Sequence, residues 1–502
     1  MTRHYDTIVI GAGSTGGVVA ARLSEDPDRQ VLLLDAGPDF PREAEMLPLV
    51  AVSGEHTWRV SGAPELDWGL FDTDRAGRRG GRPVRLPRAR MVGGTSMVNS
   101  TIAVRAAGAD LDRWAALGNS GWDYQSLLPL YRRIETDRDF GESDLHGGGG
   151  PIVINRYPCA NWAPVNRVFA EACDQAGFPW SDDLNRPGSD AGVAGAMPHN
   201  RFKEARQGTL NTYLRAARPR PNLTILGEAL VDAVDIRDGR AHGVRWLGPE
   251  GVAAATATRV VVSAGVYNSP AILMRSGIGN PQHLRDLGIP VVAGLPVGDN
   301  LTDHPGCAFF FSAARGNSLV GRLFATILRD EARDAGKPWW QLHPFPVDEE
   351  EGISGFFAFL CDQRASGTVR LKDADARSLP LVDHDYLADP ADIPRFRDAF
   401  ETMRRLVSQP AMRAIEARLL HDGGDFADYV KATMASAHHQ NGSCRMSNDP
   451  REGVVDSHLR VHGMEGLYVA DSSVFPDNII HNTNLSCHVI GEKLADEIRA
   501  GS

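Results

Sequence analysis

A glycine-rich turn near the start of the chain constrains its fold most. Three glycines, Gly11, Gly13 and Gly16, separate an apolar run at 7–10 from a stretch at 18–23 with small residues on its early turns. In this G-x-G-x-x-G pattern the first glycine permits a tight turn. The second lets the backbone approach a pyrophosphate, and the third lets helix pack on strand. The pattern predicts a nucleotide-binding βαβ unit with phosphates at the helix N-terminus.

An acidic residue closes the next predicted strand. The apolar run 30–34 ends at Asp35, which Ala36 follows. A carboxylate at this place can accept hydrogen bonds from both ribose hydroxyls, and it repels a 2′-phosphate. The unit therefore favours FAD or NAD over NADP, and the turn by itself does not decide between the two.

The chain is too long for a single hydrophobic core, because it has 502 residues and single cores stop growing at ~250–300 residues. The composition changes after residue 306, where strand-like runs surround one long predicted helix at 392–407. We predict an α/β fold with a Rossmann-like dinucleotide-binding domain and an inserted α+β substrate-binding domain. The first domain is assigned 1–150, 220–305 and 438–502, and the second 151–219 and 306–437.

Local patterns predict smaller elements. Helical periodicity covers 109–135 and 205–217, whereas 40–88 is rich in Gly, Pro and Arg and is interpreted as irregular connections. An aromatic group in the second domain either walls an apolar pocket or packs in a core, and both readings stay open. Its members are Trp339, Trp340, Phe356, Phe357 and Phe359.

Charge and cysteine content exclude several classes of protein. The formal net charge of −11 argues against a nucleic-acid partner, because neutralising phosphates needs a basic face. Six cysteines without a C-x-x-C pair argue against a disulfide framework or a zinc ribbon. No secretory signal is visible, and no apolar run approaches the ~18 residues of a membrane span. We expect a cytoplasmic protein without a metal site, and its oligomeric state stays open.

Several segments resemble the glucose–methanol–choline (GMC) oxidoreductase family. Residues 89–99 (ARMVGGTSMVN), continued by Ala103, Ala106 and Asp112, match the first family signature at every constrained position. Residues 265–279 (GVYNSPAILMRSGIG) match the second except at Val266, where the family has a smaller residue. Shorter matches are Asp67-Trp68, 297–305 (VGDNLTDHP) and 466–471. The resemblance spans 5–495 in family order and implies FAD as the cofactor. It also implies that the first domain is the FAD-binding domain and that the substrate-binding domain is built on an antiparallel sheet.

The resemblance also implies which residues hold FAD. The expected contacts are Gly11, Gly13, Ser14, Thr15, Gly16, Asp35, Ala36, Trp68, Arg90, Val92, Gly94, Met97, Val98, Asn99, Val231, Asp471, Ser472, Asn482 and Thr483. Gly93 to Ser96 offer backbone N–H groups and hydroxyls with little side-chain bulk, which suits close approach to a flat ring. Some family members attach FAD through a histidine at the position of Val98. Valine cannot form that bond, so we predict non-covalent FAD.

Two residues near the C-terminus are expected to carry the chemistry. The segment 438–446 (HHQNGSCRM) resembles the family pattern H-x-x-G-[ST]-C-x-M, whose spacing selects His439. The family has His or Asn at a second position, and register selects Asn482. A neutral imidazole can take a hydroxyl proton, an amide can hold the oxygen, and the flavin takes the hydride. His438 and His481 are candidate substrate contacts, or loop residues.

The resemblance implies oxidation of an alcohol, and we expect a primary alcohol with O₂ as the acceptor. Bacterial members of the family act on hydroxymethylfurfural and aryl alcohols, choline, pyridoxine and amino sugars, and the sequence does not choose among them. The acidic net charge favours a cationic or polyhydroxy substrate. Two alternatives stay open: a dehydrogenase that passes electrons to a quinone or another acceptor, and a cyanohydrin lyase without net redox chemistry.

Overall fold

The glycine-rich turn directly follows a strand of a mostly parallel sheet. The computed structural model describes residues 3–42, 63–189, 192–313, 326–330, 340–348 and 352–501. Five strands of this sheet run parallel: β1 (His4–Ile10), β2 (Val31–Leu34), β11 (Leu223–Leu226), β14 (Gly251–Val262) and β25 (Leu467–Val469). The antiparallel strands β12 (Leu230–Arg237) and β13 (Arg240–Gly248) complete the order β11-β2-β1-β14-β13-β12, with β25 paired to β14.

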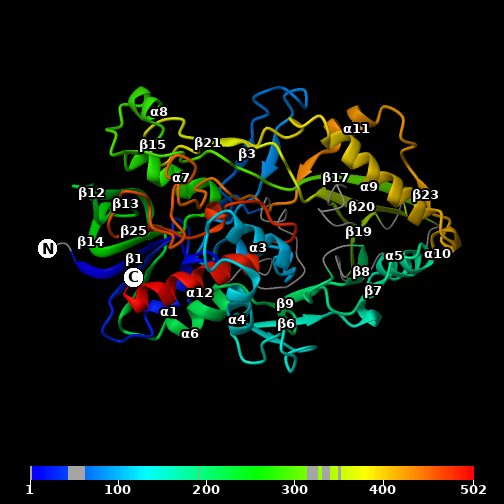
Figure 1. Ribbon diagram of the computed structural model, residues 1–502, viewed down its shortest axis with the longest axis horizontal. Helices are drawn as coiled ribbons and strands as arrows, with labels where there is room; N and C mark the ends of the chain where they lie inside the picture. Colours follow the sequence, from blue (N-terminus) through cyan, green and yellow to red (C-terminus); the bar gives the residue numbers. More distant parts are fainter. Residues whose placement is uncertain are drawn as a thin grey trace.

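Both ends of the chain meet at this sheet. Strand β2 is a continuous run of Val and Leu and is buried along its whole length, as expected for a parallel strand covered on both faces. Helix α1 (Gly16–Leu23) lies beside α12 (Asn484–Ala500), the first in blue and the second in red in Figure 1. An added Cβ at Gly491 would lie 2.9 Å from the Thr15 carbonyl oxygen, so a glycine is needed for this close packing.

A second large sheet lies in the other half of the molecule (Figure 1). Its order is β23 (Arg418–Leu419), β17 (Pro305–Ser312), β20 (Ile353–Leu360), β19 (Trp340–Asp348), β18 (Thr326–Asp330), β8 (Val193–Ala196) and β7 (Trp180–Ser181), with β24 (Ala435–Ser436) paired to β17. All neighbours are antiparallel except β7 and β8. Helices α5 (Pro164–Gln175) and α9 (Asp392–Val407) pack on this sheet through a separate core. The predicted fold class is confirmed.

Smaller elements connect the two halves. One four-stranded sheet has the order β10 (Ala205–Arg206), β9 (Pro198–Phe202), β6 (Ile152–Arg156), β5 (Glu135–Asp137), and another the order β21 (Thr368–Arg370), β22 (Leu381–Asp383), β3 (Leu70–Asp72), β4 (Val84–Leu86). The remaining helices include α7 (Gly265–Arg275), α8 (Pro281–Asp286), α10 (Pro410–Ala414) and α11 (Phe426–Thr433). Within the described ranges, no helix is both long and apolar enough to cross a membrane.

Three local predictions are corrected. The 109–135 segment is two helices, α3 (Gly108–Ala116) and α4 (Tyr124–Ile134), because Gly118 and Gly121 take positive φ between them and the Asp123 side chain caps α4. The 205–217 segment begins as strand β10 and becomes helical only at Leu210. Strands β3 and β4 lie within 40–88, of which 43–62 falls outside the described residues.

The predicted domain boundaries remain a prediction. Leu210 and Leu214, which fall in the segment assigned to the second domain, pack in the same core as β1 and β2. Strand β5, assigned to the first domain, pairs with β6 of the second.

Candidate active site

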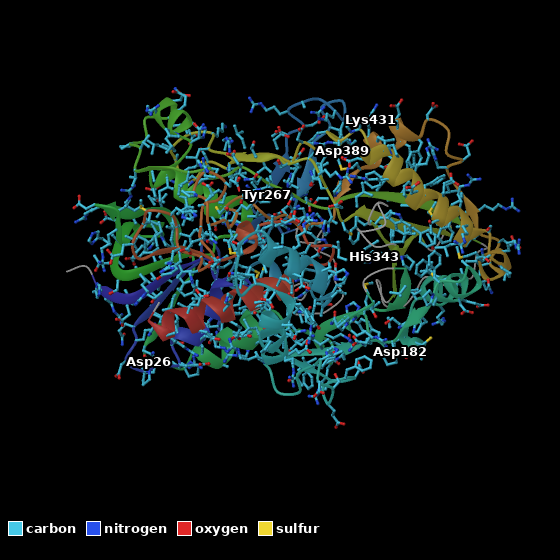
Figure 2. The ribbon with its side chains drawn as sticks, viewed as in Figure 1. Asp26, Asp182, Tyr267, His343, Asp389 and Lys431 are labelled. Atoms are coloured by element: carbon cyan, nitrogen blue, oxygen red, sulfur yellow. The ribbon has the colours of Figure 1, made fainter. Side chains whose placement is uncertain are left out.

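A cavity of about 540 Å³ runs from the glycine-rich turn to the space between the two large sheets. Tyr267 on α7 and His343 on β19 line it from the two halves, and both are labelled in Figure 2. Most of the expected FAD contacts line this cavity: Gly11, Gly13, Ser14, Thr15, Asp35, Ala36, Trp68, Gly94, Asn99, Val231, Asp471, Ser472, Asn482 and Thr483.

The three positions of the turn require glycine for different physical reasons. Gly11 takes a φ of +94°, and an added Cβ would lie 2.3 Å from the Ser263 carbonyl oxygen. At Gly16 an added Cβ would lie 1.9 Å from the Gly11 carbonyl oxygen. An added Cβ at Gly13 would meet only Gly94 Cα, at 4.0 Å. Gly11 and Gly16 are therefore required by the fold itself, whereas Gly13 keeps open the space that a pyrophosphate would fill.

The carboxylate of Asp35 lies at the nucleotide end of the cavity. Its two oxygens accept the main-chain N–H groups of Ala12 and Gly37, each at 2.9 Å. Burial raises the pKa of Asp35 to about 6. Each oxygen retains a further lone pair, so the group can still accept hydrogen bonds from ribose hydroxyls.

Buried polar atoms without a hydrogen-bond partner among the described residues gather on the cavity wall. They are Ser263 Oγ, His438 Nδ1, Gln440 Oε1, Asn482 Oδ1 and Asn484 Nδ2. Each such atom costs about 1–3 kcal/mol when it stays unpaired. A long ligand rich in donors and acceptors would pair them, so these residues and the open space at Gly13 fit FAD.

Some expected FAD contacts do not line the cavity. Val92, Met97 and Val98 are buried in the core of the first sheet, and Gly16 is buried as the first residue of α1. The Arg90 guanidinium lies 5.9 Å from the ring centre of Trp68, which does line the cavity. Contacts from these five residues to FAD remain predictions.

The structure brings His439 and Asn482 together. His439 Nε2 lies 2.9 Å from Asn482 Nδ2, and both residues line the cavity. His439 follows β24, whereas Asn482 immediately precedes the N-cap of α12. Removal from bulk water lowers the pKa of His439 well below its ordinary value, so the ring is neutral at pH 7 and can accept a proton.

The two neighbouring histidines differ. His438 lines the cavity with a φ of +66°, and its main-chain N–H donates to Ser436 Oγ at 2.8 Å. Burial lowers its pKa to about 4. His481 does not line the cavity, because its Nδ1 hydrogen-bonds to the Arg105 carbonyl oxygen at 2.6 Å. His481 is buried, which favours its second reading as a loop residue, and the substrate contact stays a prediction.

Sequence reasoning missed the two residues that hold His439. Asp303 Oδ1 accepts the main-chain N–H of His439 at 2.9 Å, and His304 Nδ1 lies 2.9 Å from His439 Nδ1. The antiparallel pairing of β17 with β24 places Pro305 opposite Ser436, and it thereby brings the preceding His304 to the following His439. The sequence feature that could have revealed them is the segment VGDNLTDHP, which contains both residues and to which no role was assigned.

An aromatic wall faces His439 across the cavity. It consists of His343 and Phe345 on β19 and Phe357 and Phe359 on β20, and the ring centre of Phe359 lies 5.7 Å from that of His439.

Strand alternation decides which aromatic residues reach the cavity. Phe356 and Trp340 pack in the core under α5 and α9, whereas Phe357 and Phe359 line the cavity. Both readings of the aromatic group are therefore correct for different members, and Trp339 lies outside the described residues.

A separate buried cluster contains residue types that can bind a metal, and its charged groups are paired with one another. Glu135, Asp137 and His146 bring their ligand atoms within 4.8 Å of one another. His146 Nδ1 lies 2.8 Å from Glu135 Oε1, and its Nε2 lies 3.0 Å from Asp183 Oδ2. Burial by itself lowers the His146 pKa, but hydrogen bonds to these carboxylates outweigh it and raise the pKa to about 10. The contacts pair this imidazole with three carboxylates, which makes the cluster an ion network.

The fold and the cavity define an oxidoreductase with a dinucleotide cofactor and a neutral histidine at the reacting end. Two family models, both for GMC oxidoreductases, match residues 5–306 and 363–491. The oxygen-dependent choline dehydrogenases of Klebsiella pneumoniae and Chromohalobacter salexigens are each 35% identical to this chain and cover 99% of it, over 96% and 95% of their own lengths. The chain belongs to the GMC oxidoreductase family.

Solved structures agree with this membership. Pyridoxine 4-oxidase from Mesorbium loti superposes with a TM-score of 0.89 at 26% identity, covering 99% of both chains. A fungal aryl-alcohol oxidase shares the fold with a TM-score of 0.84 at 22% identity, over the whole of both chains. The predicted family, the FAD cofactor and the oxidation of a CH–OH donor are confirmed.

Proposed function

We propose that this enzyme oxidises a neutral primary alcohol, with His439 as general base and Asn482 as the hydrogen-bond partner of the substrate oxygen. The 2.9 Å contact between His439 Nε2 and Asn482 Nδ2 carries the proposal, because it puts a proton acceptor and an amide donor side by side, where the hydroxyl of one substrate can meet both. FAD, when bound, supplies the hydride acceptor.

The residues of this pair have separate tasks. His439 Nε2 accepts the hydroxyl proton while the Asn482 amide donates to the oxygen as it gains negative charge. Gln440 and Ser436 hold the Asp303 carboxylate, which in turn holds the His439 main chain. The base therefore keeps its position during proton transfer. Holding the reacting groups in place is a main source of rate enhancement in such sites.

The charge of the cavity favours a neutral substrate. Its described lining includes only two carboxylates, Asp35 and Asp471. Both accept main-chain N–H groups at the sheet that contains β1 and β2. Arg88 also lines the cavity, and it donates to the carbonyl oxygens of Pro87 and His438. A cation beside the aromatic wall would find no carboxylate on the described lining at that end of the cavity, because Asp303 lies behind His439 and is held by Ser436 and Gln440, and Arg88 would repel it. This local balance outweighs the acidic net charge of the whole chain.

A matched pair of alcohols tests the substrate class. Choline and 3,3-dimethylbutan-1-ol have the same shape, but only choline is charged. We expect 3,3-dimethylbutan-1-ol and benzyl alcohol to bleach the flavin under anaerobic conditions faster than choline at equal concentration. Faster bleaching by choline would refute the neutral-substrate proposal. A cyanohydrin that is cleaved without any bleaching would instead favour the lyase.

The names of the choline dehydrogenases and of the oxidases support O₂ as the acceptor. Hydrogen peroxide formed in air, in a one-to-one ratio to aldehyde, tests this part of the proposal. Aldehyde formation that needs an added quinone would favour the dehydrogenase.

The pH dependence of flavin reduction follows from the neutral state of His439. A histidine with an ordinary pKa of about 6.5 keeps about a quarter of its rings unprotonated at pH 6. Since burial lowers the His439 pKa well below that value, we expect nearly equal rate constants at pH 6 and pH 8. Anaerobic stopped-flow absorbance at saturating alcohol measures them. A fourfold slower reaction at pH 6 would contradict the assigned protonation state.

Release of FAD on denaturation tests the non-covalent attachment. Val98 is buried in the first core and offers no nucleophile. We therefore expect acid-precipitated protein to form a colourless pellet and to leave all the FAD in the supernatant. A yellow pellet would show a covalent bond.

A further inference from the structure

His304 contacts the ring of His439 through the nitrogen that does not face Asn482. The two Nδ1 atoms are 2.9 Å apart, and His304 Nε2 lies 2.7 Å from the Ile479 carbonyl oxygen. His304 is fully buried, and its ring stacks on Phe359 with centres 5.9 Å apart. A continuous line of hydrogen bonds thus runs from a main-chain carbonyl through two imidazole rings to the cavity.

The carbonyl sets the direction of this line. A carbonyl oxygen only accepts hydrogen bonds, so His304 carries its proton on Nε2 and, as a neutral ring, presents a lone pair at Nδ1. His439 must then donate from its own Nδ1. Its Nε2 is left with the lone pair, and Asn482 Nδ2 donates to it at 2.9 Å, which agrees with the same direction.

We propose that His304 is a positioning residue that holds His439 in the Nδ1–H tautomer, with the basic Nε2 toward the substrate hydroxyl. This inference rests on the proposed role of His439 as the base. A neutral imidazole without such a partner divides between two tautomers. In the wrong one, Nε2 already carries a proton and cannot accept another.

The line of hydrogen bonds also suits the state after proton transfer. The His439 ring is then positively charged, and its Nδ1–H still points at the His304 lone pair. His304 in turn is polarised by the Ile479 carbonyl oxygen at 2.7 Å. The same contacts therefore select the tautomer before the transfer and stabilise the imidazolium after it.

Two variants separate tautomer control from packing. His304→Leu removes the acceptor, whereas His304→Asn puts an amide oxygen near the place of Nδ1. We expect His304→Leu to lower the rate constant of anaerobic flavin reduction by roughly 10- to 100-fold, the range found for the partners that orient metal-binding histidines. His304→Asn should recover most of the wild-type rate.

Nitrogen NMR of the ¹⁵N-histidine-labelled holoenzyme reads the tautomer directly, because protonated and unprotonated ring nitrogens have well-separated shifts. The His439 signals are those missing from His439→Gln. In the wild type and in His304→Asn at neutral pH, we expect a proton on Nδ1 and none on Nε2. In His304→Leu, we expect a mixture or a proton on Nε2.

A wild-type spectrum with the proton on His439 Nε2 would overturn the inference, even if His304→Leu did not fold. A His304→Leu enzyme with wild-type rate and tautomer would do the same. If His439→Gln still reduced its flavin normally, the assigned base would be wrong, whereas the wild-type spectrum would still report the tautomer. The matched control is His462→Phe, which loses a ring contact to the Ser447 carbonyl at 2.8 Å outside the cavity and should change neither readout.

Discussion

Replacing His439 with Gln is expected to slow flavin reduction by roughly 10²- to 10⁴-fold, the usual contribution of a general base. A Gln side chain can still contact Asn482, but it cannot take the hydroxyl proton. FAD binding should persist, because the residues around the glycine-rich turn are unchanged. Anaerobic stopped-flow bleaching gives the rate, and absorbance of the purified protein gives the FAD content.

His458→Gln is the matched control for this change. His458 is exposed and lies 3.3 Å from Glu497, outside the cavity, so its replacement should leave the rate at the wild-type value. A His439→Gln enzyme with full FAD content and an unchanged rate would remove His439 from the role of base.

Replacing Gly13 with Val is expected to yield folded protein that binds FAD roughly 10- to 100-fold more weakly. The added Cβ meets only Gly94 Cα at 4.0 Å, so the free energy of unfolding of the apoprotein should change little. The branched side chain would instead fill the place of the pyrophosphate. Overfilling a tight site costs about 1–3 kcal/mol or more, and each 1.4 kcal/mol is about tenfold in affinity.

Fluorescence titration of apoprotein with FAD measures the affinity, and chemical unfolding of the apoprotein measures its stability. Gly149→Val serves as the control, because Gly149 is exposed, has no atom within 4 Å of an added Cβ and lies outside the cavity. Gly11→Val would not serve, since its Cβ would strike the Ser263 carbonyl at 2.3 Å and disturb the fold itself. Wild-type affinity in Gly13→Val would show that the pyrophosphate lies elsewhere.

Predictions of local structure were correct where a single short segment contains the whole sequence pattern. The turn from Gly11 to Gly16 and the strand that ends at Leu34, just before Asp35, lie as expected, because a short stretch of sequence contains the whole pattern of each. The 109–135 segment failed because helical periodicity continues on both sides of the turn at Gly118 and Gly121. The proposed roles of His439 and Asn482 still await kinetic tests.

The sequence alone determined the family and the FAD cofactor, and it predicted the pair His439 and Asn482, because each of the motifs involved is a short segment with recognisable residues. Only the tertiary structure decided how the base is held. His304 lies 135 residues before His439, and the β17–β24 pairing joins them. Likewise, only the assembled sheet shows that Phe357 faces the cavity while Phe356 faces the core. Such contacts depend on which strands pair across long separations, and local spacing carries no record of that choice.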